Sequence, residues 1–121
     1  MRFLALAVLL SATAATAQQG LRDSDILLSE AELTEYVSGQ VLEYYTDGLA
    51  TYQTDGGFDY RYEADGERIP GTYKVMPEST VCTDYVNGFS RCDMIVKAGE
   101  RYVMIIENGE RYPIRSRTAI E

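Results

Sequence analysis

The stretch DGGFDYRYEADG, residues 55–66, decides the fold of this 121-residue chain. Between its two Asp-Gly pairs, aromatic side chains at 58, 60 and 62 alternate with charged side chains at 59, 61 and 63. Because successive side chains of a strand point to opposite faces, the alternation predicts a strand with one buried and one solvated face. Asp-Gly is a preferred hairpin dipeptide, so tight turns are expected at both ends of this strand.

Turn dipeptides of the same kind occur on both sides of this stretch. The turn pairs are Asp47-Gly48, Asp55-Gly56, Asp65-Gly66, Asn87-Gly88 and Asn108-Gly109, with Ala98-Gly99 a weaker sixth. Short runs rich in Tyr, Val, Ile and Thr lie between them, and residues 71–75 repeat the alternation. We therefore predict a mainly β fold: an antiparallel meander of about seven or eight strands, forming a curved sheet or a small barrel.

The last hairpin is expected to have two apolar faces. A two-residue turn at Asn108-Gly109 sets its register. The expected cross-strand pairs are Ile105 with Tyr112, Val103 with Ile114, and Tyr102 with Arg115. Side chains 102, 104 and 106 then point away from 103 and 105, so either a helix or a partner should cover one of the two faces.

One short helix is expected before the strands, over Glu30 to Ser38. Ser29 and Glu32 form a capping box, in which the hydroxyl and the carboxylate each accept from the other residue's backbone N–H. Leu28 and Leu33 stand at the positions of the matching hydrophobic staple. Gly39 is a suitable left-handed stop.

The two cysteines, Cys82 and Cys92, are expected to form a structural disulfide. If Val86-Asn87-Gly88 is a three-residue loop with Gly88 in a left-handed conformation, the two cysteines stand directly opposite each other. A direct cross-strand pair has a Cβ separation close to what a disulfide needs. Closing this loop should contribute roughly 3 kcal/mol of stability.

The first 17 residues read as a signal peptide. Met1-Arg2 precedes the apolar run from Phe3 to Leu10, and Ala15-Thr16-Ala17 is a cleavage site of the A-x-A kind. Cleavage after Ala17 predicts a periplasmic or secreted protein without stable membrane insertion, since the apolar run is too short to span a bilayer. The expected mature chain has a flexible lead-in over 18–27 and one β-rich domain over 28–121.

The charge of the chain limits its partners. Eleven basic residues face 19 acidic ones, and removal of Arg2 with the signal leaves 10 against 19. Such an acidic surface repels nucleic acid and anionic lipid and attracts cationic partners at low salt. We expect an envelope or secreted protein partner, with no nucleic acid; the acidic first half is either a docking surface or only a solubilising one.

Catalytic and metal chemistry find little support in the residue types. The chain has no His, which removes Ser-His and Cys-His nucleophile pairs and His-based metal sites. Its carboxylates mostly fall at turns or on outward strand positions, and the Asp-Gly spacing does not fit an EF-hand. We therefore expect no enzyme activity, no metal and no cofactor.

Tyrosine is the unusual feature of the composition, with ten Tyr and no Trp. Aromatic cross-strand pairs stabilise sheets, yet Tyr is also enriched at binding surfaces. Arg near the C-terminus either binds an anionic group or protects an edge strand. The candidate binding face consists of Tyr44, Tyr52, Tyr60, Tyr62, Tyr102, Met104, Arg111 and Arg115.

The order of these features resembles a recurring type of small secreted bacterial β protein of unknown function. The shared features are the helix ending in Gly39, the Asp65-Gly66 turn, the Gly71-Thr72-Tyr73 strand and the pair Cys82 and Cys92. The resemblance implies a β fold and an exported location, and it implies no activity.

Three functions are open from the sequence. The first is a non-enzymatic module that binds another protein of the periplasm or envelope. The second is an acidic inhibitor of a basic secreted enzyme such as a lysozyme. The third is a small-ligand carrier with a lipocalin-like barrel.

Overall fold

The computed structural model describes residues 19–46 and 48–121, so the signal peptide expected over 1–17 lies outside the described residues. The elements are β1 (Ile26–Leu27), α1 (Glu30–Val37), β2 (Gln40–Tyr44), β3 (Leu49–Tyr52), β4 (Gly57–Arg61), β5 (Ile69–Met76), β6 (Thr80–Tyr85), β7 (Ser90–Ala98), β8 (Arg101–Ile105) and β9 (Arg111–Ala119). The predicted mainly β class with one short helix is confirmed. Among the described residues, no helix is long and apolar enough to cross a membrane.

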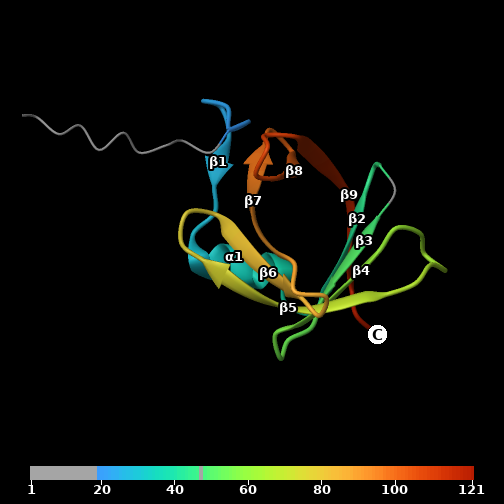
Figure 1. The fold of residues 1–121 in the computed structure, drawn as a ribbon. Coiled ribbons are helices and arrows are strands. Elements are labelled where there is room, and N and C mark those ends of the chain that lie inside the picture. The colour runs from blue at the N-terminus through green and yellow to red at the C-terminus, as the bar shows by residue number, and fades with distance from the viewer. Residues whose placement is uncertain (1–18, 47) are drawn as a thin grey trace, which may run out of the picture.

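Strands β2 to β9 form a closed antiparallel barrel (Figure 1). Each strand pairs with the next along the chain, and β2 pairs with β9 to close the circle, with Val41 opposite Thr118. The barrel is thus a simple meander, as the regular turn spacing predicted. Of the two predicted forms, curved sheet or barrel, the structure has the barrel.

The alternation of side chains gives the barrel two kinds of apolar packing. The interior holds the larger cluster, which includes Leu42, Tyr52, Phe58, Val81 and Ile95. A smaller cluster of Met94, Val96, Val103 and Ile105 is buried separately, with Leu21 packed against it. Both faces of the last hairpin are therefore covered by this chain itself, one by the barrel interior and one by the N-terminal segment.

The N-terminal segment before the helix is tied to the barrel. β1 pairs with β7, Ile26 opposite Lys97, and so extends the sheet. The carboxylate of Asp25 accepts two hydrogen bonds from the guanidinium of Arg111, at 2.6 and 2.9 Å. Although 18–27 is polar and aperiodic in sequence, these contacts hold its second half on the outside of β7 and β9.

Helix α1 closes one end of the barrel. The capping box between Ser29 and Glu32 is present, as predicted. The helix ends at Val37, one residue before the predicted Ser38, and Gly39 has the predicted left-handed backbone with a φ of 73°. Leu33 and Val37 are completely buried in the interior cluster. Tyr36 stacks on Tyr102 of β8 with ring centroids 4.2 Å apart, which fixes the helix over the start of that strand.

The register expected for the last hairpin is wrong by one residue. Ile106 donates its N–H to the carbonyl of Glu110, so the loop has three residues and Gly109 adopts a φ of 90°. Met104 consequently stands opposite Tyr112, and Arg115 is not paired with Tyr102. The extra loop residue is the reason: Gly109 serves as a left-handed bulge residue instead of the second position of a two-residue turn.

One predicted solvated position is also wrong. Asp59, expected on the wet face of β4, is buried. The guanidinium groups of Arg61 and Arg68 lie 4.0 and 3.5 Å from its carboxylate oxygens and compensate its charge. Asp59 therefore points outward from the barrel, but the side chains beside it cover its carboxylate.

The hairpin between β5 and β6 has no turn glycine. Glu78 and Ser79 both adopt positive φ, at 62° and 57°. Ser79 is fully buried; its hydroxyl accepts from the N–H of Leu28 at 2.7 Å and donates to the carbonyl of Ile95 at 2.5 Å. These bonds link the start of the helix to β7 and hold the unusual backbone of the turn.

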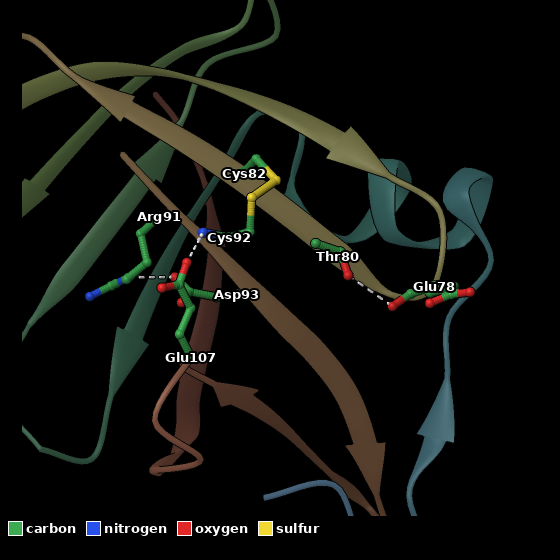
Figure 2. The surroundings of a disulfide bond; sticks show 7 residues. All are labelled: Glu78, Thr80, Cys82, Arg91, Cys92, Asp93 and Glu107. Carbon is green, nitrogen blue, oxygen red and sulfur yellow. Dashed lines mark hydrogen bonds and ion pairs between the residues drawn. A yellow bond between two sulfur atoms is a disulfide. The ribbon is translucent and has the colours of Figure 1, made fainter. Parts of the chain in front are cut away.

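The disulfide is confirmed in the predicted register. Cys82 of β6 stands opposite Cys92 of β7, with a Cα–Cα distance of 4.0 Å (Figure 2). The loop between these strands begins after Tyr85, whose N–H donates to the carbonyl of Phe89, and Gly88 is left-handed. A disulfide is consistent with an oxidising compartment.

Candidate functional site

The end of the barrel opposite the helix is open and holds a pocket of about 520 Å³. We call this pocket the mouth. Its lining residues are Tyr44, Thr46, Tyr60, Tyr62, Ile69, Tyr85, Asn87, Phe89, Arg91, Met104, Ile106 and Tyr112. Pockets for small molecules usually measure about 300–1,000 Å³ and are largely apolar with a few polar groups, which is what this mouth offers.

Strand alternation explains why these side chains meet. Tyr44 ends β2, Tyr60 lies near the end of β4, and Tyr85 ends β6, all at the barrel end far from α1. Arg91, near the start of β7, lines the mouth at the same end of the barrel. The large apolar cluster fills the barrel interior at the helix end, whereas the mouth lies at the other end.

Five of the twelve residues that line the mouth are tyrosines. The hydroxyl of Tyr44 donates to the sulfur of Met104 at 3.2 Å, and the rings of Tyr60 and Tyr62 meet edge to face at 5.1 Å. Burial raises the pKa of the Tyr44 and Tyr85 phenols above the ordinary value of 10. The phenols remain uncharged at neutral pH, so the walls offer aromatic faces and hydroxyl groups.

An ion pair stands at the inner end of the mouth. Nε of Arg91 donates to Oδ2 of Asp93 at 2.8 Å (Figure 2). Asp93 is 4% exposed, and within residues 19–46 and 48–121 its Oδ1 has no hydrogen-bond partner. Burial raises the pKa of the Asp93 carboxyl, and Arg91 offsets part of that effect.

A second, small cavity, which we call the narrow extension, lies beside the mouth and shares Tyr44, Tyr85 and Arg91 with it. It measures about 10 Å³, and Asp93 lines it together with Arg91, Tyr44 and Tyr85. This is close to the space that a single water-sized group occupies. A small polar group placed in the extension would lie beside the carboxylate.

The rim of the mouth exposes large apolar side chains. Val86 and Phe89, on the β6–β7 hairpin, are 76% and 71% exposed, and Tyr62 is 65% exposed. Phe89 and Tyr62 also line the mouth. The entrance of the mouth is thus bordered by solvent-exposed apolar and aromatic side chains.

The residues of the sequence-predicted binding face do not lie together in the structure. Tyr44, Tyr60, Tyr62 and Met104 line the mouth. Tyr52 lies deeper, against the narrow extension, and Tyr102 stacks under the helix. Arg111 holds Asp25, and the guanidinium of Arg115 lies 6.0 Å from the ring of Tyr45, so neither arginine lines the mouth.

Sequence reasoning missed the polar end of the mouth. Arg91 and Asp93 flank Cys92, and neighbouring residues of a strand point to opposite faces. Once the disulfide is placed on the outside of the hairpin, the two charged side chains must point into the barrel. That signal was present, but charges on a strand are ordinarily assigned to solvent.

Metal chemistry and known relatives give no further assignment. Within the ranges 19–46 and 48–121, no three His, Cys, Asp or Glu side chains gather where they could hold a metal ion. Comparison with known protein families, with characterised proteins and with solved structures found no match for this chain.

Proposed function

We propose that this protein is an exported binding protein for a small, largely apolar molecule, which it holds in the mouth of the barrel. The observation that carries the proposal is the aromatic pocket of about 520 Å³ with an ion pair at its inner end, formed by the half-exposed Arg91 and the buried Asp93. Apolar walls supply binding energy through burial, and a few polar groups orient the ligand.

Export is the second part of the proposal. The basic start, the short apolar run and the Ala15-Thr16-Ala17 site support a signal peptide cleaved after Ala17, and the Cys82–Cys92 disulfide supports an oxidising compartment. Mass spectrometry of the protein purified from the periplasm or medium should give a chain beginning at Gln18. A chain that keeps residues 1–17 would contradict export by this signal.

The test of ligand binding uses N-phenylnaphthylamine, an uncharged dye that fluoresces in apolar surroundings. Titration should give saturable binding of one dye per protein. Ile69→Trp fills the mouth from β5 and should abolish binding, whereas Thr72→Trp places the same bulk on the exposed side of β5 and should leave it intact. Absence of dye binding, or equal binding by both variants, would overturn the proposal.

Binding of another envelope or secreted protein is a second candidate, favoured by the exposed Val86, Phe89 and Tyr62 on the rim. A partner retained from envelope extract should be lost when Val86, which does not line the mouth, is replaced by Asp, while dye binding persists. If the variant still retains the partner, or if it loses dye binding together with the partner, the rim is not a separate binding surface. The inhibitor hypothesis stays a prediction, tested by titrating the chain against lysozyme turnover at low and high salt.

A further inference from the structure

The ion pair of the mouth points to the class of ligand, an inference that rests on the proposed ligand-binding function. The Arg91–Asp93 pair brings one positive and one negative group together at the inner end of an otherwise uncharged, aromatic pocket. The pair itself has no net charge, and Glu107, whose carboxylate accepts from the N–H of Cys92, lies on the neighbouring loop. The field of the pair is that of a dipole, which favours a dipolar partner over a single ion.

Both members of the pair have hydrogen-bonding capacity to spare. Arg91 uses Nε for Asp93, and among the described residues its two terminal nitrogens have no partner. Asp93 uses Oδ2 for Arg91, while its buried Oδ1 has none. The site thus offers several donors beside one unsatisfied acceptor, and a buried acceptor without a partner is costly.

Charged ligands would meet an opposing charge here. A carboxylate placed on the terminal nitrogens of Arg91 lies in the field of Asp93, and an ammonium group placed on Asp93 lies in the field of Arg91. Either ion would also lose its own hydration on entering the aromatic pocket. An uncharged group that both accepts and donates gains from both residues and loses much less.

We infer that the ligand is an uncharged aromatic molecule with a primary-amide-like group, whose carbonyl accepts from Arg91 and whose NH₂ donates to Asp93. The narrow extension of about 10 Å³ beside Asp93 suits an NH₂ group, which is similar in size to water. The tyrosine walls suit the ring, since aromatic groups gain from stacked and edge-to-face contacts.

The experiment compares three probes that share one ring: naphthamide, naphthoate and naphthylmethylammonium, each measured by displacement of N-phenylnaphthylamine at pH 7. Native protein should bind the amide about tenfold more tightly than either ion, the equivalent of one hydrogen bond to a charged group. A best probe other than the amide, or three equal affinities, would overturn the inference.

Two variants then test the role of each charge. Asp93→Asn leaves Arg91 uncompensated and should make naphthoate the preferred probe, whereas Arg91→Gln should make naphthylmethylammonium the preferred probe. The controls Asp84→Asn and Lys74→Gln change net charge equally on exposed positions and should keep the native order. An unchanged order in both mouth variants would also overturn the inference.

The dye separates this inference from the proposed function. Dye bound in the mouth and not displaced preferentially by the amide would overturn the ligand class alone. Absence of dye binding would overturn both the inferred ligand class and the proposed ligand-binding function.

Discussion

Arg91 and Asp93 lie two residues apart on β7, and Nε of the first donates to Oδ2 of the second across 2.8 Å inside the barrel. Asp93 is almost completely buried, whereas the Arg91 side chain is 37% exposed. The arginine therefore bridges solvent and a carboxylate that solvent does not reach. Removing one partner should have a different consequence from removing both.

The first prediction concerns this pair and stability. Arg91→Leu should lower the free energy of unfolding at pH 7 by about 2 kcal/mol, because Asp93 loses its counter-ion; the exposure of Arg91 keeps the cost below that of a fully buried pair. Replacing both residues by Leu should recover most of this loss. Urea unfolding measures both, and a double variant as unstable as the single one would contradict the argument.

The pH dependence of the same variant follows from the direction of the Asp93 pKa. Burial raises that pKa, and loss of Arg91 raises it further. When pH falls through the raised folded-state pKa, Asp93 takes up a proton and the cost of the buried charge disappears. The difference between native and Arg91→Leu should therefore shrink in acid; a constant difference would show that Asp93 is not its source.

The second prediction concerns the ion pair between Asp25 and Arg111, which holds the N-terminal segment. Asp25→Asn should lower the free energy of unfolding by roughly 2 kcal/mol at pH 7, because the bidentate, charge-assisted hydrogen bonds from Arg111 are lost. Asp23→Asn, a neighbouring exposed carboxylate, should change stability very little. Urea unfolding of the two variants gives the comparison, and equal losses would contradict a role for the pair.

Acid should abolish the Asp25 contribution. Hydrogen bonds from Arg111 hold the Asp25 pKa below its ordinary value of 3.8, so the stabilisation is complete above that value and is lost as pH falls through the lower folded-state pKa. The stability curves of native protein and Asp25→Asn should converge there. Curves that stay parallel into strong acid would contradict this assignment.

The third prediction concerns the disulfide. Replacing Cys82 and Cys92 by Ala should lower stability by roughly 3 kcal/mol, because the unfolded chain regains the freedom that a loop with a sequence separation of 10 had removed. The bridge lies on the outer side of β7, away from the mouth. Dye affinity of the folded variant should match that of native protein, and a weaker affinity would mean that the bridge also shapes the mouth.

The sequence was sufficient for the strands, the helix and the disulfide, because each has a local signal. The alternation around Tyr60, the capping box at Ser29 and the loop before Gly88 all act over a few residues. Closure of the barrel depends on β2 meeting β9, a contact between the two ends of the domain. Nothing within either strand distinguishes a closed barrel from an open curved sheet.

The candidate site was only partly predictable for a related reason. Tyr44, Tyr60 and Met104 were predicted as part of a binding face because they are aromatic or apolar residues of neighbouring strands. Arg91 and Asp93 did not, because a charge on a strand is normally solvated and only their mutual contact makes burial tolerable. The shift in the last hairpin similarly arose from one loop residue, since loop lengths of two and three both suit Asn-Gly.

The fourth prediction concerns Ser79, the buried residue of the β5–β6 turn. Ser79→Ala should cost about 2 kcal/mol, because the N–H of Leu28 loses its acceptor in a buried place. Ser79→Gly loses the same hydroxyl but adopts positive φ without steric penalty, so it should be at least as stable as the Ala variant. Thr80→Ala, which removes an exposed hydroxyl, should have a much smaller effect.

Hydrogen exchange of the Leu28 amide shows whether stability is lost at this contact. Exchange in Ser79→Ala should accelerate at Leu28 more than at interior amides such as Ile95, whose N–H still donates to the carbonyl of residue 79. Local acceleration means that the hydroxyl fastens the entry of the helix to the barrel. Uniform acceleration across the sheet would mean that Ser79 supports global stability without a special role in holding α1.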